Sequence, residues 1–321
     1  MRHKKESILS HIKNICITLV LTAIMLVWVQ GYTDASSLKF VQISDNHFLN
    51  HGQNTTFKMI AEGPNLIDDA IEQANAIPNL DFVMFTGDLI DKSLEIELQA
   101  IMPHLAKINA PWYFAFGNHD VCVGGYLTKT LYMNILKKNN PNMNFEKPYY
   151  SFVPKKGYKV IVLDSIIDTE ITANGYIYPE EFDWLKKELE KSKKDVVLIF
   201  MHVPVVEPFP SPNHRMRNAG EVQALLESYK NPIGVFTGHY HAAKIIQHEN
   251  VLYVCTPALI SYPNAFRLIN IKNKRNRVEF DIQLKPTRLV NVQRLAKLMV
   301  FASALYAGEE KDRSGTFVIK K

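Results

Sequence analysis

The sequence has little cysteine, no internal repeat and no tract of low complexity. Three cysteines in 321 residues, Cys16, Cys122 and Cys255, are too few for a disulfide framework. The formal net charge of +5 is too mild to favour a nucleic-acid partner, so no specific nucleic-acid binding is expected. With 47% hydrophobic and 21% charged residues, the composition excludes a disordered or fibrous protein and supports one large globular domain.

The longest apolar run, residues 15–29, is shorter than the roughly 20 residues that span a bilayer. It follows a basic stretch at the N-terminus, and this combination predicts a secretory signal. Three interpretations stay open: a signal cleaved after Ala35, an uncleaved signal anchor, or a buried helix. The first two place the rest of the chain outside the cytoplasm, either secreted or periplasmic, or anchored facing outward with residues 15–29 as a membrane tether.

Short β-branched and aromatic runs alternate with amphipathic stretches from Leu38 onward, and several strand-like runs then follow one another. Strands are predicted over Lys39–Ser44, Phe82–Thr86, Trp112–Phe116, Tyr149–Val153, Tyr158–Leu163, Val196–Met201, Gly234–Thr237, Ala243–Gln247, Leu252–Cys255, Phe266–Ile271 and Val278–Leu284. Helices are predicted over Leu66–Ala76, Leu94–Ile108, Pro179–Lys191 and Glu221–Tyr229. This order predicts a layered α/β fold with sheets inside and helices outside.

Three parts of the chain are expected: a signal peptide or anchor over 1–35, a catalytic domain over 36–285, and a helix and tail over 286–321. The final helix is predicted over Leu289–Tyr306. We expect it to pack on the core, and contact with a membrane surface or a second subunit stays open as an alternative. The sequence carries no signal of the oligomeric state.

Five short polar motifs each follow a predicted strand directly. They are Asp45-Asn-His47, Gly87-Asp88-Leu-Ile-Asp91, Gly117-Asn118-His119-Asp120, His202 and Gly238-His239-Tyr-His241. Because the carboxyl ends of strands gather functional groups at one edge of an α/β sheet, we expect these side chains to meet. They supply carboxylate, imidazole and amide ligands without a thiolate, which suits Mn, Fe or Zn rather than a structural cysteine site.

Two of the motifs place ligand types two residues apart. Asp45 and His47, like His239 and His241, would point to the same side of an extended backbone and could hold one ion. Any one pair is more often a hydrogen-bonded turn or a core histidine. The occurrence of all five motifs at strand ends argues against that simpler explanation.

In order and in full, these motifs match the pattern D-x-H, GD, GNH[DE], H and GHxH, and the sequence therefore resembles the calcineurin-like metallophosphoesterases. The resemblance covers about Leu38 to Ile271. It implies a four-layer αββα sandwich with two mixed sheets and a dinuclear metal centre. On this resemblance, one metal is bound by Asp45, His47 and His241, the other by Asn118, His202 and His239, and Asp88 bridges both. His119 would lie near the leaving group and act as general acid or transition-state stabiliser, and Asp91 would orient His119.

The resemblance also implies an enzyme, a metal-dependent hydrolase of phosphomonoesters or phosphodiesters. Two divalent ions about 3.5–4 Å apart would activate a bridging hydroxide for attack on a small-molecule phosphate ester. Asp91 occupies the position of a tyrosine in purple acid phosphatases, which argues against an iron–tyrosinate centre. The motif Gly117–Asp120 and the stretch 256–267 resemble the cyclic nucleotide phosphodiesterase branch, a first alternative. A non-catalytic metal-binding or ligand-binding module on the same fold is the alternative of another class.

Other polar residues near the motifs carry weaker signals. Arg267 could reach a substrate phosphate or form a surface ion pair, and Tyr240 could stack on a substrate ring or pack against a loop. Cys122 and Cys255 are expected to be free, buried thiols rather than a disulfide. His214 has no partner at ligand spacing and is expected to be an ordinary polar residue.

Overall fold

The computed structural model describes residues 15–22 and 37–321, which belong to two units, Met1–Ser37 and Leu38–Lys321. Residues 15–22 are helical. The predicted signal or tether over 15–29 thus lies partly outside the described residues, and the predicted cleavage site after Ala35 lies wholly outside them. In the described part of the chain, no helix has both the length and the apolar character needed to cross a membrane.

Two six-stranded mixed sheets form the centre of the second unit. The first has the strand order β12-β11-β10-β1-β2-β3, with β1, β2 and β3 parallel and β10, β11 and β12 antiparallel. The second has the order β4-β5-β6-β7-β9-β8, parallel from β5 to β9 with an antiparallel strand at each edge. The strands are β1 Ser37–Ile43, β2 Phe82–Thr86, β3 Trp112–Ala115, β4 Tyr150–Phe152, β5 Tyr158–Val162, β6 Val196–Phe200, β7 Ile233–Thr237, β8 Lys244–His248, β9 Val251–Cys255, β10 Ala265–Asn273, β11 Arg277–Pro286 and β12 Gly315–Lys320.

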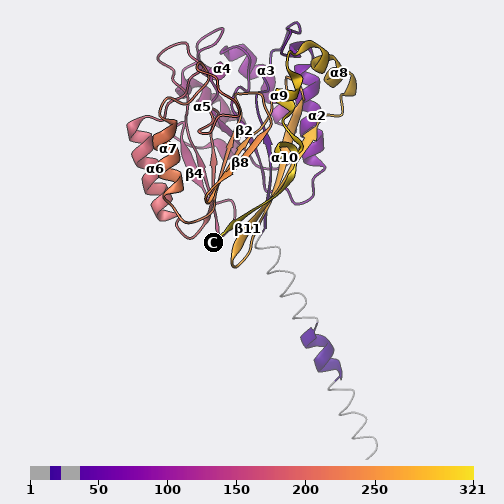
Figure 1. The fold of residues 1–321 in the computed structure, drawn as a ribbon. Helices are drawn as coiled ribbons and strands as arrows, with labels where there is room; N and C mark the ends of the chain where they lie inside the picture. The colour runs from indigo at the N-terminus through magenta and orange to yellow at the C-terminus, as the bar shows by residue number, and fades with distance from the viewer. Residues whose placement is uncertain (1–14, 23–36) are drawn as a thin grey trace, which may run out of the picture. The chain divides into compact units, whose positions relative to one another are not determined.

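Helices cover the outer faces of the two sheets. Figure 1 shows α6 and α7 together on one side of the strands and α2 on the other. The helices are α2 Gly63–Asn75, α3 Glu95–Leu105, α4 Asn118–Val121, α5 Lys129–Asn139, α6 Pro179–Lys191, α7 Ala219–Glu227, α8 Val290–Met299, α9 Ser303–Ala307 and α10 Glu310–Arg313, with short 3₁₀ turns at Ile60–Glu62 and Pro141–Met143. The predicted α/β fold, two mixed sheets flanked by helices, is confirmed.

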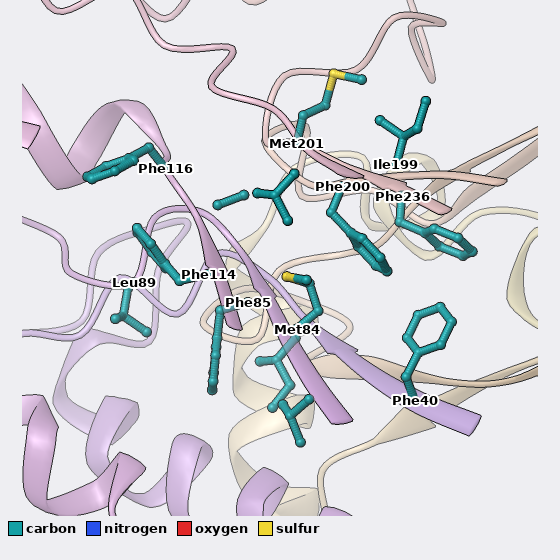
Figure 2. Close-up of a cluster of buried hydrophobic side chains, with 14 of the residues drawn as sticks. Phe40, Met84, Phe85, Leu89, Phe114, Phe116, Ile199, Phe200, Met201 and Phe236 are labelled. Carbon is teal, nitrogen blue, oxygen red and sulfur yellow. The ribbon is translucent and has the colours of Figure 1, made fainter. Parts of the chain in front are cut away.

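Aromatic side chains hold the two sheets together. Phe40 of β1 is fully buried, and its ring centroid lies 5.3 Å from that of Phe200 in β6 and 5.1 Å from that of Phe236 in β7, both edge to face (Figure 2). Phe82 of β2 stacks on Phe40 at 4.9 Å. Such pairs add about 0.5–1.5 kcal/mol each beyond the burial of their surface. The packed sheets thereby bring the carboxyl ends of β1, β2, β6 and β7 to one end of the molecule.

The C-terminal region differs from its prediction. The single helix expected over Leu289–Tyr306 is wrong, because α8 ends at Met299 and α9 begins only at Ser303. Between them Val300 is extended and buried, and Ala302 adopts a left-handed conformation with φ 59°. The tail then forms β12, which pairs with β11 at the edge of the first sheet and has no counterpart in the sequence prediction.

Candidate metal centre

The loops after β1 and β2 are joined by backbone hydrogen bonds that continue the parallel sheet. Asp45 N donates to Gly87 O at 3.1 Å, and His47 N donates to Asp88 O at 2.9 Å. Glycines allow these loops to approach their neighbours: a Cβ at Gly238 would lie 1.8 Å from Ser44 Oγ. At Gly117 it would lie 2.2 Å from the backbone nitrogen and Oδ1 of Asp88. The motif glycines therefore let backbone pass directly against the candidate ligands.

Five candidate ligands adopt a backbone conformation that side chains rarely favour. Asp45, His47, Asp88, His239 and His241 have φ between 42° and 71°. Left-handed backbone costs about 1–3 kcal/mol for a non-glycine residue and persists only where its surroundings determine it. Since only nine described non-glycine residues have positive φ, the concentration of five in these motifs points to a functional site.

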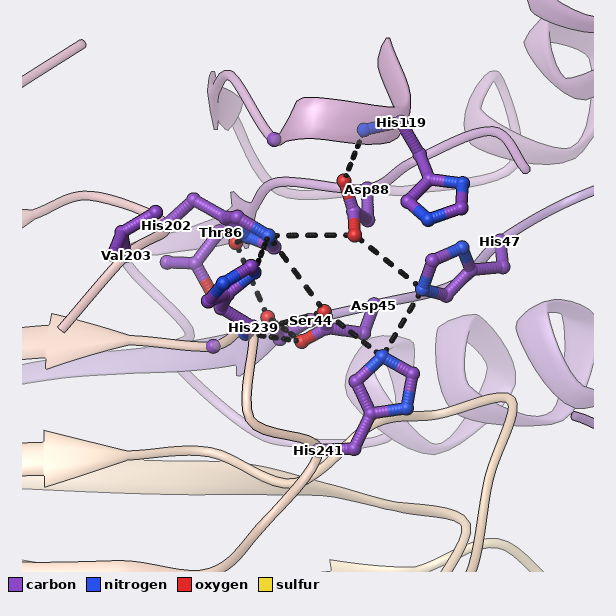
Figure 3. A network of polar contacts seen from close by, with 12 residues as sticks. Ser44, Asp45, His47, Thr86, Asp88, His119, His202, Val203, His239 and His241 are labelled. Carbon is purple, nitrogen blue, oxygen red and sulfur yellow. Dashed lines mark hydrogen bonds and ion pairs between the residues drawn. The ribbon is translucent and has the colours of Figure 1, made fainter. Parts of the chain in front are cut away.

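The first group of candidate ligands comprises Asp45, His47, Asp88 and His241, all buried. His47 Nε2 lies 3.1 Å from His241 Nε2 and 3.4 Å from Asp88 Oδ2. Asp45 Oδ1 lies 3.4 Å from His241 Nε2, and Asp45 is held by the backbone N–H of His239 at 3.0 Å. The four side chains thus point their donor atoms at one another (Figure 3).

The second group comprises Asp88, His202 and His239. His202 Nε2 lies 3.3 Å from Asp88 Oδ2 and 3.0 Å from His239 Nδ1. Asn118 starts α4 beside the same cavity, and its buried Oδ1 has no hydrogen-bond partner among the described residues. Figure 3 shows Asp88 between His202 and His47, and the same oxygen, Oδ2, therefore serves both groups.

The spacing of these donor atoms fits metal coordination. Ligand atoms about 2.0–2.2 Å from a cation, at angles of about 90–110°, are about 2.8–3.6 Å apart. The donor-atom distances above, 3.0 to 3.4 Å, fall in this range. The residues therefore fit two metals that share Asp88.

Hydrogen bonds outside the two groups support this fit. His202 Nδ1 donates to Thr86 O at 2.7 Å, which leaves the lone pair of neutral His202 on Nε2, facing His239 Nδ1. Two facing ring nitrogens need either a hydrogen bond, with a proton on one of them, or a cation between them. Although burial opposes it, the carboxylates of Asp88 and Asp45 raise the pKa of His202 to about 9. The pocket is therefore electrostatically suited to cations, which would compete with this proton.

The orientation of the His47 ring is fixed by contacts to Nδ1, the ring nitrogen that does not face the other candidate ligands. Asp91 Oδ1 lies 3.1 Å from His47 Nδ1 and accepts a 2.7 Å hydrogen bond from Lys58 Nζ. Burial, together with the ammonium of Lys58, lowers the pKa of His47 to about 3, so the ring is neutral. Burial works against ionisation of Asp91, but the hydrogen bond from His47 and the charge of Lys58 outweigh it and hold the pKa of Asp91 below its ordinary value.

His119 borders the cavity next to the first group. Its ring centroid is 4.4 Å from that of His47, and its Nδ1 donates to the backbone oxygen of Asp91 at 2.7 Å. The carboxylate of Asp91 is more distant, at 3.7 Å. Asp91 thus orients His119 through its main chain, whereas its side chain mainly serves His47 and Lys58.

Asp120 organises the loops, a function that the sequence prediction did not assign. Its carboxylate accepts backbone hydrogen bonds from Gly117, Asp88, Leu89 and Ile90 at 2.8–3.3 Å, and one from the hydroxyl of Tyr132 at 2.9 Å. Because Asp120 is fully buried, these bonds tie the Gly-Asp and Gly-Asn-His loops together within the protein. The sequence signal that could have revealed this function is the carboxylate at the fourth position of the Gly-Asn-His-Asp motif.

A cavity of about 340 Å³ opens over the two groups. Its polar lining includes Lys58, Ser211 and His214, and its apolar wall is formed by four aromatic side chains that contact one another or His241, namely Phe57, Phe209, Tyr240 and Tyr306. His214 borders the cavity, with its ring centroid 5.4 Å from that of His239, but it belongs to neither group of candidate ligands. Lys58 and Tyr306 were missed because neither has a fixed spacing from a motif.

The structure resolves the other secondary candidates. Arg267 is fully buried and donates to the backbone oxygens of Cys255, Asp312 and Arg313, so it neither contacts the cavity nor forms a surface ion pair. Cys122 and Cys255 are buried free thiols, as predicted. Tyr240 is buried, packs edge to face against Phe209 and lines the cavity.

Comparison with known proteins agrees with this geometry. A sequence model described as calcineurin-like phosphoesterase matches residues 38–243. A protein of Fibrobacter succinogenes named probable cyclic nucleotide phosphodiesterase is 26% identical over 234 residues, which cover 69% of this chain and 79% of the relative. The tartrate-resistant acid phosphatase type 5 of Rattus norvegicus is 27% identical over 256 residues, 70% of this chain and 73% of the relative. The crystal structure of a dimetal phosphatase from Danio rerio superposes with a TM-score of 0.63 at 17% identity, over 78% of this chain and 96% of that one, and shows a shared fold.

Proposed function

Because the chain belongs to the calcineurin-like phosphoesterase family, whose members are metal-dependent hydrolases, we propose that it hydrolyses phosphomonoesters or phosphodiesters at a centre of two divalent cations. Asp45, His47 and His241 would hold one cation, Asn118, His202 and His239 the other, and Asp88 both. The observation that carries this proposal is the position of Asp88 Oδ2, 3.4 Å from a nitrogen of one group and 3.3 Å from a nitrogen of the other. Imidazole, carboxylate and amide ligands suit Mn, Fe or Zn.

When bound, two such cations lower the pKa of water and neutralise charge on the phosphoryl oxygens. The residues of the chain supply the remaining requirements. His119 Nδ1 donates to the backbone oxygen of Asp91, so Nε2 faces away from this contact and can donate a hydrogen bond only when the ring is an imidazolium with a proton on both nitrogens. From the cavity wall, His119 would donate a proton or hydrogen bond to the departing alcohol oxygen, a contribution of typically about 10²–10⁴-fold.

The test is metal content together with hydrolysis. Purified chain is stripped with a chelator, reloaded with Mn, Fe or Zn, and assayed on bis(p-nitrophenyl) phosphate. Two metals per chain and metal-dependent turnover are expected, with both lost in Asp88→Asn. Asp69→Asn is the matched control, since Asp69 is also buried but pairs with Arg288 away from the cavity. Failure to bind metal, or full activity in Asp88→Asn, would refute the proposal.

Cyclic nucleotides are a second candidate substrate class. The aromatic wall formed by Phe57, Phe209, Tyr240 and Tyr306 supports this, because base-sized rings stack on such side chains and the cavity has room beyond a phosphate. Several relatives, including the Fibrobacter protein, are named as cyclic nucleotide phosphodiesterases. Tyr306→Ala should raise KM for a 3′,5′-cyclic nucleotide several-fold and leave KM for a dialkyl phosphate unchanged. Equal effects on both substrates would exclude a base-binding role of the wall.

We also propose that residues 15–29 export the chain or tether it to a membrane, with the catalytic unit outside the cytoplasm. A basic stretch followed by an apolar segment supports this. Cell fractionation combined with N-terminal sequencing tests it. A cytoplasmic chain with an intact N-terminus would contradict the proposal.

A further inference from the structure

The inner side of α8 packs on the core through Ala296, as expected, but the outer face of α8 and α9 carries exposed apolar side chains. Leu298 is 85% exposed and Phe301 94% exposed. Val290, Leu295 and Leu305 are exposed by about half. These five residues are called here the 290–305 patch. Singly exposed apolar residues are ordinary, but five within one 16-residue stretch are consistent with an interaction surface.

The 290–305 patch is part of an ordered structure and not a fraying end. Its inner side is anchored by buried Ala296, Val300 and Ala307. Ala243 N donates to Tyr306 O at 2.9 Å, and Arg288 pairs with Asp69 at the start of the segment. The apolar face is thus preformed, so binding a partner would not carry the cost of ordering it.

Within the segment that carries the patch all charges are positive, whereas Glu309 and Glu310 follow it and Asp69 and Glu72 pair with Arg288 at its start. Residues 287–308 contain no aspartate or glutamate. Arg294 and Lys297 are exposed on α8, and neither has a carboxylate partner among the described residues. Lys297 Nζ lies 6.0 Å from the ring centroid of Tyr262 and forms no ion pair with any residue that the structure describes. A helix face that combines exposed leucine and phenylalanine with cations free of carboxylate partners is typical of a helix that lies on an anionic lipid surface.

We propose that the 290–305 patch docks onto an anionic lipid surface. Phe301 and Leu298 would enter the interface, while Arg294 and Lys297 contact anionic headgroups. The patch borders the metal centre, because Tyr306, which follows Leu305 directly, lines the cavity. Figure 1 likewise shows α8 and α9 at the end of the sheets where α4 lies, so docking would place the mouth of the cavity beside the lipid. This inference does not depend on the proposed hydrolysis or on the tether.

The experiment uses the full chain with Cys16→Ser and a single added cysteine that carries an environment-sensitive fluorophore. Leu298→Cys reports on the patch. Val153→Cys is the matched control, since Val153 is also an exposed apolar residue. It follows the end of β4, which lies beside the start of β5 and therefore at the end of the sheet opposite the metal centre. Vesicles of phosphatidylcholine with about 30% phosphatidylglycerol are compared with vesicles of phosphatidylcholine alone. The local probe separates docking of the patch from attachment through residues 15–29.

With anionic vesicles, emission from the probe at 298 should move to shorter wavelength, and emission from the probe at 153 should not. Replacing both Arg294 and Lys297 with glutamine should lower the docking equilibrium on anionic vesicles by about 30-fold at low salt, roughly fivefold per cation. On neutral vesicles the double replacement should have little effect.

Three results would overturn the proposal. The first is the same emission from the probe at 298 with and without vesicles. The second is a blue shift without vesicles that grows with protein concentration, which would assign the patch to a second copy of the chain. The third is a vesicle-free shift independent of concentration, which would mean that another segment of the same chain covers the patch.

Discussion

Replacing Asp91 with asparagine distinguishes two functions of this residue. Its carboxylate contacts Lys58 Nζ at 2.7 Å and His47 Nδ1 at 3.1 Å, whereas His119 Nδ1 bonds to the backbone oxygen of Asp91. Asparagine keeps the size and the backbone carbonyl but removes the charge. We therefore expect Asp91→Asn to weaken metal binding through His47 and to leave the orientation of His119 intact.

The size of the effect follows from the contacts. Loss of a group that orients a ligating histidine typically reduces metal affinity or activity about 10–100-fold, or about 1.4–2.7 kcal/mol. The introduced amide could still accept one hydrogen bond from His47, so Asp91→Asn should lie near the lower limit and Asp91→Ala near the upper one. Both changes also leave the ammonium of Lys58, whose side chain is only 18% exposed, without its carboxylate.

The assay is a metal titration against a competing chelator, followed by kcat at saturating metal. His119→Ala is the comparison, since it should keep both metals and lower kcat by about 10²–10⁴-fold. Asp91→Asn should instead recover most of its kcat at high metal concentration. If Asp91→Asn bound metal as tightly as the unchanged chain and had the low kcat of His119→Ala, the carboxylate would serve His119 and this reasoning would be wrong.

Three further predictions concern stability, each measured by urea unfolding. Asp120→Asn should cost about 2–6 kcal/mol, because an amide nitrogen in place of Oδ2 leaves two buried backbone N–H groups without an acceptor. A cost under about 1 kcal/mol would contradict this. Phe40→Ala should cost about 3–5 kcal/mol, since Phe40 fills the space between the sheets, whereas Phe301→Ala, at an exposed position, should stay within about 0.5 kcal/mol. Burial and the nearby Asp164 carboxylate raise the pKa of Glu181 well above its ordinary value. The folded state therefore holds this proton more tightly than the unfolded state, so the free energy of unfolding falls as pH rises above the ordinary pKa of glutamate. Glu181→Gln should reduce this fall. An unchanged slope of the free energy of unfolding between about pH 5 and 8 would exclude Glu181 as its cause.

The sequence was most informative where a strand ends in a motif. The strands before Asp45, Asp88, His202 and His239 have β-branched and aromatic residues, and the polar residue that follows each marks the sheet edge. Because carboxyl ends of parallel strands meet at one edge of a sheet, the order of strands and motifs places Asp45 beside Asp88 within the first sheet. Packing of the second sheet on the first then brings His239 to Asp45, 194 positions away. The five motifs therefore predicted both the fold class and the neighbourhood of the candidate ligands.

Contacts between irregular segments could not be predicted in this way. Lys58 lies in a loop 11 residues after His47, and only the folded loop brings its ammonium to Asp91. Tyr306 reaches the cavity because the final helix breaks at Val300, and no proline or glycine signals that break. Helix α5, by contrast, was missed although Thr128 caps it by accepting from Leu131 N at 3.1 Å.

The backbone of the centre accounts for both the strain and the precision of the site. Left-handed conformations at Asp45, His47 and Asp88 would be unfavourable in an isolated loop. Here the loops that follow β1 and β2 hydrogen-bond to each other, and the carboxylate of Asp120 accepts hydrogen bonds from backbone amides of the loop after β2. These hydrogen bonds thus offset the cost of the left-handed backbone without using the candidate ligand atoms. The donor atoms are thereby held facing one another by the fold, an arrangement that favours cation binding.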